Sequence, residues 1–313
     1  MLRTMGVSAN DRNSRRGGRW VAAGMAAAAV GVAGTVLVVV VGHRPGRTSS
    51  SETSVVSHPG PSPRTDELLT PARHERAVRR VARRGLPVYR GGPRGRYVAL
   101  TFDDGPGPLT ATALRVLGAV GAHATFFVVG SNVARWSALV AQEAALGAVG
   151  DHTWSHPYLP HLPHASQMSQ LRRGQAAAAQ ATGRRIELFR PPYGGLDRVI
   201  DGEVRRLGML EVLWSVDSGD SGGADWRGIM RNVRAGLRPG GAIILFHENR
   251  GQTLKALNRL LPEIRSRGFI PVSVPELLAL EPPPLAQIRA DARSLRTPPG
   301  AVDHHGRTRR PAW

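Results

Sequence analysis

The chain has 313 residues, no cysteine and a formal net charge of +19. This length accommodates one sizeable domain with extensions, and the absence of cysteine excludes a fold that depends on disulfides. The charge is concentrated in the flanking segments, because residues 97–281 hold 19 basic and 16 acidic residues. No nucleic-acid-binding motif accompanies it. We therefore expect an anionic cell envelope as a partner, either phospholipid headgroups or an acidic wall polymer, and no nucleic acid.

The first 42 residues predict a membrane anchor. Residues 1–20 are basic, with five arginines, and form the expected cytoplasmic end. Residues 21–42 carry no charged side chain, and this run is long enough to span a bilayer as one helix. Because the arginines precede the run, the positive-inside rule places the rest of the chain outside the cytoplasm, in a single-pass protein of the cell membrane. A cleaved signal peptide is the alternative, but its apolar core is usually about 7–15 residues and ends at a small-x-small site, which this run lacks.

Residues 43–94 are expected to connect the anchor to the globular domain. Residues 48–64 are rich in Ser, Thr and Pro, which is typical of an exposed linker. Residues 65–85 combine apolar side chains with many arginines and are expected to form a basic helix on the domain or near the membrane. The domain itself is expected at residues 95–281. The Arg- and Pro-rich tail, residues 282–313, is predicted to be disordered.

Strand-like and helix-like segments alternate within the domain, which predicts a mainly parallel α/β sheet, either open or closed into a barrel. The expected helices cover residues 110–120, 133–146, 166–182 and 254–267. Three apolar runs end in a chemically functional residue: residues 97–102 in Asp103, 187–189 in Arg190 and 242–246 in His247. Since α/β proteins place their sites at the carboxyl ends of strands, these residues are expected to share one site.

Two adjacent carboxylates and two histidines form a candidate metal site. His152 and His156 have a spacing known for zinc ligands, and Asp103 and Asp104 stand together at a predicted strand end. One carboxylate can bind a metal ion while its neighbour moves a proton, which suits a metal-assisted hydrolase. Asp104 and both histidines then supply three ligands and leave open positions. Non-haem iron oxygenases use a similar donor set, but their acid usually follows the first histidine by two residues, whereas Asp104 precedes His152.

With these motifs in view, the chain resembles the polysaccharide deacetylases of carbohydrate esterase family 4, the NodB-homology group. The resemblance covers about residues 95–281 and rests on five motifs in the family's order: Thr101-Phe102-Asp103-Asp104-Gly105-Pro106, His152-Thr153-Trp154-Ser155-His156, Arg190-Pro191-Pro192-Tyr193-Gly194, Asp217-Ser218-Gly219-Asp220 and Leu245-Phe246-His247. It implies a deformed (β/α) barrel with the site at the strand carboxyl ends. It also implies a divalent metal held by Asp104, His152 and His156, with zinc expected and cobalt, nickel or another divalent ion as alternatives.

The resemblance further implies a role for each remaining motif residue. Asp103 would be the general base, and Arg190 would hold its orientation. The backbone N–H of Tyr193 would stabilise the oxyanion. His247 would protonate the leaving amine as general acid. Asp217 is the expected partner of His247, with Asp220 as the second choice.

The implied reaction removes N-acetyl groups from a cell-wall or chitin-like glycan and releases acetate. The same residues would serve O-acetyl esters of xylan or another polysaccharide, so this reaction is the alternative, and a non-catalytic glycan-binding module is the third. The fourth motif departs from the family because Ser221 follows Asp220 where an aromatic wall residue is usual. Either Trp226 reaches back into the pocket, or this wall is missing. Trp226 is equally compatible with a core position at the start of a helix.

Overall fold

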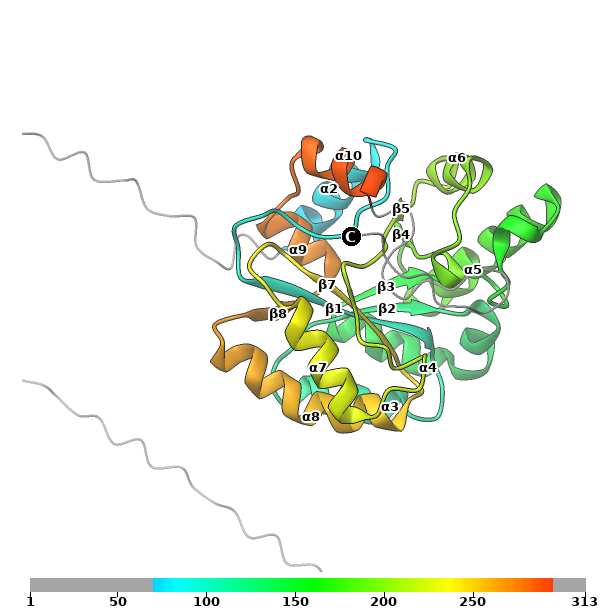
Figure 1. Cartoon of the computed structure of the whole chain (residues 1–313). Coiled ribbons are helices and arrows are strands. Elements are labelled where there is room, and N and C mark those ends of the chain that lie inside the picture. Colours follow the sequence, from blue (N-terminus) through cyan, green and yellow to red (C-terminus); the bar gives the residue numbers. More distant parts are fainter. Residues whose placement is uncertain (1–69, 295–313) are drawn as a thin grey trace, which may run out of the picture. The chain divides into compact units, whose positions relative to one another are not determined.

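The computed structural model describes residues 70–294 (Figure 1). The expected cytoplasmic end and membrane span, residues 1–20 and 21–42, lie outside this part, as do most of the linker and residues 295–313. Among the described residues, no helix is both long and apolar enough to cross a membrane.

A curled sheet of parallel strands forms the centre of the described part, which confirms the predicted α/β class (Figure 1). The strand order is β5-β4-β3-β2-β1-β7-β6, and β8 pairs with the start of β1. The strands are β1 (Tyr97–Gly105), β2 (Thr125–Val128), β3 (Ala148–Asp151), β4 (Leu188–Phe189), β5 (Leu210–Glu211), β6 (Val216–Asp217), β7 (Ile243–His247) and β8 (Ile270–Val272).

The two ends of this strand order are consecutive in the chain. β5 pairs with β4 and β6 pairs with β7, and only residues 212–215 separate β5 from β6. Val88 bridges to Val212, directly after β5, and Arg90 bridges to Ala242, directly before β7. The segment before β1 therefore joins the two ends of the strand order. The sheet therefore curls until its edges approach one another.

Helices cover the sheet in two groups that match two apolar clusters. Alternate residues of β1 point to opposite faces, so Val98, Leu100 and Phe102 join one cluster while Ala99 joins the other. The first cluster packs against α3 (Thr110–Gly118), α4 (Gly130–Leu146), α5 (His164–Thr182), α6 (Arg198–Arg206), α7 (Trp226–Gly236) and α8 (Gly251–Ser266). The second packs against α2 (Pro71–Ala82), α9 (Val274–Leu280) and α10 (Leu285–Ser294).

The domain extends beyond the expected boundaries of residues 95 and 281. Helix α2 buries Ala77, Val78 and Val81, and it packs against α9. Helix α10 occupies residues predicted to be disordered, where Ile288 is buried and Asp291 forms an ion pair with Arg90 at 3.2 Å. These apolar and paired contacts stabilise segments whose arginine-rich composition alone suggests an exposed tail, so the prediction was wrong for residues 285–294.

Candidate metal centre

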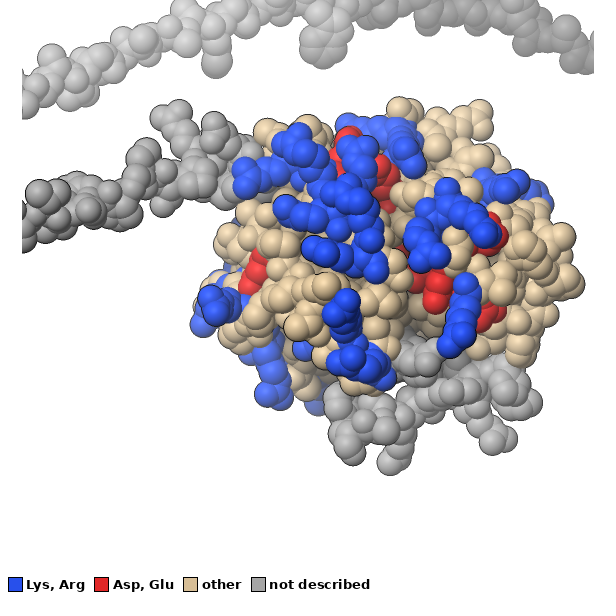
Figure 2. All heavy atoms as spheres, turned by 90° about the horizontal axis from the view of Figure 1, so that it is seen from above, with Lys and Arg blue, Asp and Glu red and all other residues tan. Residues whose placement is uncertain are grey.

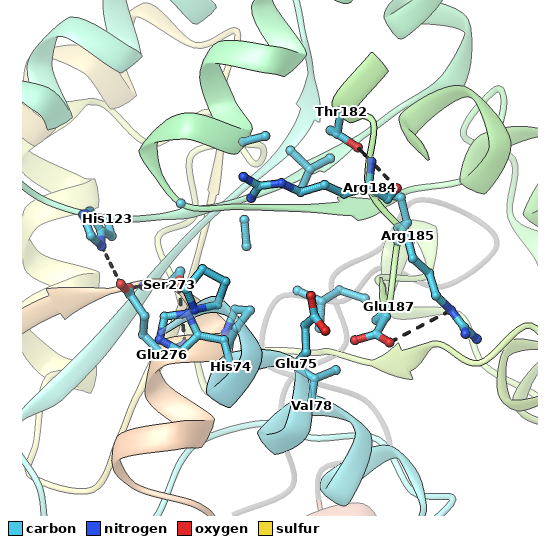
Figure 3. Close-up of a pocket in the computed structure, with 18 of the residues that line it drawn as sticks. His74, Glu75, Val78, His123, Thr182, Arg184, Arg185, Glu187, Ser273 and Glu276 are labelled. Carbon is cyan, nitrogen blue, oxygen red and sulfur yellow. Dashed lines mark hydrogen bonds and ion pairs between the residues drawn. The ribbon is translucent and has the colours of Figure 1, made fainter. Parts of the chain in front are cut away.

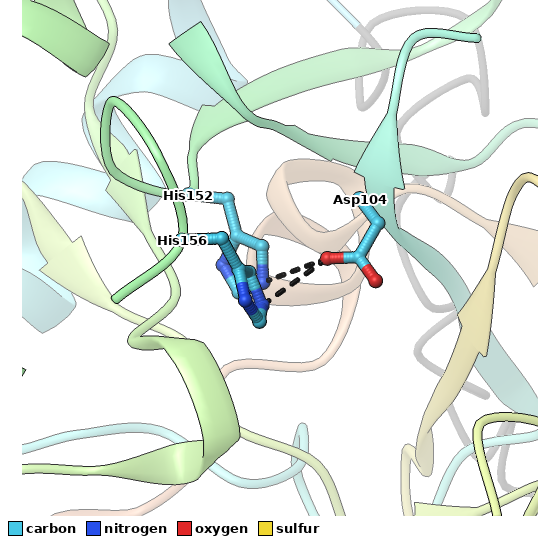
Figure 4. A group of neighbouring side chains, drawn as sticks. All are labelled: Asp104, His152 and His156. Atoms are coloured by element: carbon cyan, nitrogen blue, oxygen red, sulfur yellow. Dashed lines mark ion pairs between the residues drawn. The ribbon is translucent and has the colours of Figure 1, made fainter. Parts of the chain in front are cut away.

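Asp104, His152 and His156 meet at the carboxyl ends of β1 and β3, as predicted (Figure 4). Asp104 Oδ1 lies 3.2 Å from His156 Nε2 and 3.7 Å from His152 Nε2. The ligand atoms of all three residues lie within 4.8 Å of one another. Buried Asp104 Oδ1 accepts no hydrogen bond from the described residues although it faces two imidazoles. This donor set fits a divalent cation with open coordination positions.

The backbone fixes the direction of the His152 ring. His152 is buried, and its Nδ1 lies 2.7 Å from the Arg190 carbonyl oxygen, so Nδ1–H donates to this oxygen. The lone pair is then on Nε2, which faces Asp104, as expected for a histidine that binds metal. Burial, followed by the neighbouring charge of His156, lowers the pKa of His152 to about 3, so the ring is the neutral form that a metal requires.

Strained backbone is concentrated at this site. Among the described residues, the non-glycine residues with a left-handed φ are Asp104 at 69°, Thr153 at 68°, His156 at 58° and Tyr193 at 60°. This conformation is unfavourable for side chains with a Cβ and persists only where the surrounding structure enforces it. The left-handed backbone directs these side chains differently from an extended strand end, which supports a functional site.

Asp103 and Arg190 form a buried ion pair beside the three ligands. Arg190 Nη1 donates to Asp103 Oδ1 at 2.8 Å and to Thr101 Oγ1 at the same distance. The other guanidinium donors reach the carbonyl oxygens of Val212 and Leu213. Burial raises the pKa of Asp103, and the charge of Arg190 opposes this rise. The sequence thus placed both residues correctly in one site, and the sheet fixes Arg190 with no exposed surface.

His247 lies across the strand pair from Asp103, but its partner is Asp220 and not Asp217. His247 Nδ1–H donates to Asp220 Oδ1 at 2.8 Å, and Asp220 Oδ2 accepts from the His247 backbone N–H and from Thr253 Oγ1. Burial lowers the pKa of His247, but the hydrogen bond and charge of Asp220 outweigh it and raise this pKa to about 9. Asp217 Oδ1 instead accepts from the Gly219 N–H at 2.7 Å, which closes a local turn. The first choice of partner is therefore corrected to the second.

Aromatic side chains line one side of the metal centre. The Tyr193 ring, 42% exposed, contacts the His156 ring edge-on at 4.7 Å and lies 6.2 Å from the Tyr158 ring. Trp226 does not take part. It is the first residue of α7, packs against the core and contacts the cationic side chains of Arg227, Lys255 and Arg259. Trp226 is thus a partly buried helix-start residue packed against the core, which is nearer to the second interpretation than to a pocket wall.

Two buried glutamates beneath the site were not predicted. Glu248 follows His247, its N–H donates to the Asp103 carbonyl, and its side chain accepts from Thr110 Oγ1 at 2.7 Å. The second glutamate is Glu143 on α4, whose carboxylate oxygens have no hydrogen-bond partner among the described residues. Burial, followed by the charge of Glu248, raises the pKa of Glu143 well above its ordinary value, and burial raises that of Glu248 to about 7. Nothing in the sequence around Glu143 marks it as buried.

Comparison with known proteins gives consistent matches. The family model for polysaccharide deacetylase matches residues 90–212. A peptidoglycan-N-acetylglucosamine deacetylase of Listeria monocytogenes is 35% identical over 187 residues, or 58% of this chain and 38% of the relative. A chitooligosaccharide deacetylase of Bradyrhizobium sp. is 35% identical over 202 residues, or 58% of this chain and 90% of the relative. The chain spans about a quarter to two fifths of the length of the Listeria monocytogenes relative and of two further curated relatives that it matches.

Solved structures show the same fold. A family 4 carbohydrate esterase from Streptomyces lividans, in complex with acetate, has a TM-score of 0.54 and 35% sequence identity. The match covers 57% of this chain and 92% of that one. The similarity therefore includes nearly all of the Streptomyces lividans esterase chain.

Proposed function

Because the chain belongs to the polysaccharide deacetylase family, we propose that it is a metal-dependent hydrolase that removes N-acetyl groups from a cell-wall or chitin-like glycan and releases acetate. One observation carries the proposal. A candidate metal site of three residues, Asp104 with His152 and His156, lies beside the buried carboxylate Asp103, and Asp103 is the register partner of His247, whose pKa is raised to about 9. We also infer that the curled sheet is the deformed (β/α) barrel implied by the sequence motifs.

When bound by Asp104, His152 and His156, a divalent ion supplies an acidified water and polarises the acetyl carbonyl oxygen. We propose zinc, with cobalt and nickel as alternatives, because neutral imidazole and carboxylate suit all three. The unpartnered Asp104 Oδ1 and the fixed Nε2 of His152 support this assignment.

Asp103 and His247 divide the proton transfers. Asp103 is held by Arg190 on one oxygen, and its second oxygen lies 3.7 Å from His152 Nε2, so it faces the metal centre and can accept the proton of the attacking water. His247 stays protonated at neutral pH and can donate to the leaving nitrogen. Tyr193, held in a left-handed turn after two prolines, would offer its N–H to the developing oxyanion.

The test is acetate release by the full chain from peptidoglycan, chitooligosaccharide and acetylated xylan, with and without a chelator. Release from an N-acetyl glycan that stops with chelator and returns with zinc supports the proposal. Release only from acetylated xylan would favour the second candidate, ester hydrolysis, which the esterase name of the Streptomyces lividans protein supports. Glycan binding without any acetate release would leave a non-catalytic module, although the residues that catalysis needs are all present: Asp103, Asp104, His152, His156, Arg190 and His247.

We further propose that residues 21–42 anchor the protein in the cell membrane with the domain outside the cytoplasm. The uncharged run and the arginines before it support this location. Protease added to intact spheroplasts should digest the domain. Full-length protein in the cytosolic fraction would contradict the anchor.

A further inference from the structure

A small cavity lies at the end of the sheet away from the metal centre. It has a volume of about 210 Å³, and four arginines and one glutamate account for its charged lining: Arg79, Arg83, Arg185, Arg205 and Glu187. We name it the arginine pocket. Its residues belong to α2 and the position after it (Arg83), to α6 (Arg205), and to the segments just before β4 and β5, at the amino ends of these strands. The candidate metal ligands lie at the carboxyl ends of β1 and β3, so the two sites lie at opposite ends of the parallel strands.

The charge of the arginine pocket is only partly neutralised. Arg79 pairs with Glu187 at 3.3 Å and with Glu75 at 2.8 Å, and Arg185 Nε lies 4.0 Å from Glu187. Within residues 70–294, Arg83 and Arg205 form no ion pair or hydrogen bond through their side chains. Two guanidinium groups with free donors beside two shared ones favour a ligand with several anionic oxygens.

The neighbouring larger cavity differs in charge, which sets the arginine pocket apart. It has a volume of about 410 Å³ and shares Arg79, Arg185 and Glu187 with it (Figure 3). Its other charged residues are close to balanced, since Glu75 and Glu276 accompany Arg184, and His123 pairs with Glu276 at 2.5 Å. An anion would therefore be attracted to the smaller cavity first.

The arginine pocket opens on a broad basic surface. Figure 2 looks onto the end of the domain with α2, α6 and α10 and shows many Lys and Arg side chains there, with smaller groups of Asp and Glu beside them. Exposed arginines of these helices outside the pocket are Arg76, Arg80, Arg198, Arg206, Arg289 and Arg293, of which Arg206 forms an ion pair with Glu203. A cluster of this kind is attracted to an anionic lipid surface, at about 1 kcal/mol per basic residue, or about fivefold in affinity.

We propose that the arginine pocket and the basic surface around it dock on the phosphate headgroups of anionic phospholipids. The position in the chain favours a bilayer over another polyanion, because only 28 residues separate the expected span, which ends at Gly42, from Pro71 of α2. Docking at the amino ends of the strands would direct the carboxyl ends, with the metal centre, away from the bilayer. The proposal does not depend on the chemistry of that centre.

The chain has no cysteine, so one introduced thiol can report on docking. Ala82→Cys places it in the lining of the arginine pocket, and the full chain is reconstituted in bilayer discs of phosphatidylcholine, with or without phosphatidylglycerol. The rate of reaction with a neutral maleimide is measured. We expect slower labelling in discs with phosphatidylglycerol, and recovery at high salt, because the Debye length falls from about 10 Å at 0.1 M to about 3 Å at 1 M.

Matched double variants distinguish docking through the arginine pocket from a general effect of net charge. Arg83→Gln with Arg205→Gln breaks no ion pair and should lower the ratio of docked to free protein about 25-fold. Arg231→Gln with Arg238→Gln removes the same charge from α7 and the residues after it, away from α2 in Figure 1, and should leave docking unchanged.

Three results would overturn the proposal. The first is equal labelling in both kinds of disc. The second is an equal loss of protection in both double variants, which would reduce the effect to net charge. The third is protection by inorganic phosphate or polyphosphate in phosphatidylcholine discs as strong as that by phosphatidylglycerol, which would assign the pocket to a soluble anion.

Discussion

Replacing Asp220 by Asn should shift the alkaline limit of activity, because Asp220 sets the protonation of His247. The change keeps the shape but removes the charge that accepts from His247 Nδ1–H at 2.8 Å. A charge-assisted hydrogen bond contributes about 1.5–3 kcal/mol, and 1.36 kcal/mol corresponds to one pKa unit. The pKa of His247, raised to about 9 in the native protein, should therefore fall by about 1–2 units.

The loss of rate should depend on pH. At pH 8 the native His247 is about nine-tenths protonated, whereas a pKa lowered by about 1–2 units leaves between one half and one tenth protonated. We expect kcat for acetate release to fall about two- to tenfold at pH 8 and much less at pH 6. The assay is a pH–rate profile of acetate release for the native protein and the variant.

Asp217→Asn is the matched control, because Asp217 is half-buried near His247 but its Oδ1 accepts a hydrogen bond from the Gly219 N–H. Its profile should keep the native alkaline limit. If Asp217→Asn moves this limit and Asp220→Asn does not, the reasoning from hydrogen-bond geometry is refuted.

Three further changes test other parts of the site. Arg190→Met leaves the Asp103 charge buried without its cation and should lower the free energy of unfolding by about 3–5 kcal/mol; a loss below about 1 kcal/mol in denaturant unfolding would contradict a buried pair. Glu143→Gln removes one of two neighbouring buried carboxyls whose pKa values are raised. A carboxyl group whose pKa is raised in the folded state stabilises the fold at low pH, and this contribution is lost as the pH rises from about 4.3 through about 7. In urea unfolding, the free energy of unfolding of the variant should therefore fall less between pH 5 and pH 8 than that of the native protein. His156→Ala should remove bound metal and activity together, and full turnover by the metal-free variant would exclude the metal centre.

The sequence predicted that the three candidate ligands, Asp104, His152 and His156, come together, because each follows from a local pattern. Asp104 ends a strand, and His152 and His156 sit in one short loop, so strand-end placement and spacing suffice. The resemblance favours Asp217 over Asp220, because it pairs the first acid of the fourth motif with His247. Which of them reaches His247 depends on Thr253, a residue of α8 that the turn sequence does not reveal.

The burial of charged side chains was harder to predict than the positions of the helices that carry them. Glu143 lies in a correctly predicted helix, but its carboxyl is buried near Glu248, a residue 105 positions later in the chain. Helix α10 likewise depends on long-range contacts of Ile288 and Asp291. These contacts join residues far apart in the chain, and a single sequence carries no local signal for them.

Asp103 and Asp104 offer the most direct test of the central claim, that a metal-dependent site divides ligand and base between neighbouring carboxylates. Bound zinc and acetate release are measured in the same samples of the native chain, Asp103→Asn and Asp104→Asn. Asp103→Asn should keep its metal while kcat falls by about 10²–10⁴. Asp104→Asn should lose metal affinity and regain part of its rate when zinc is added. Loss of metal from Asp103→Asn, with metal retained by Asp104→Asn, would contradict the account.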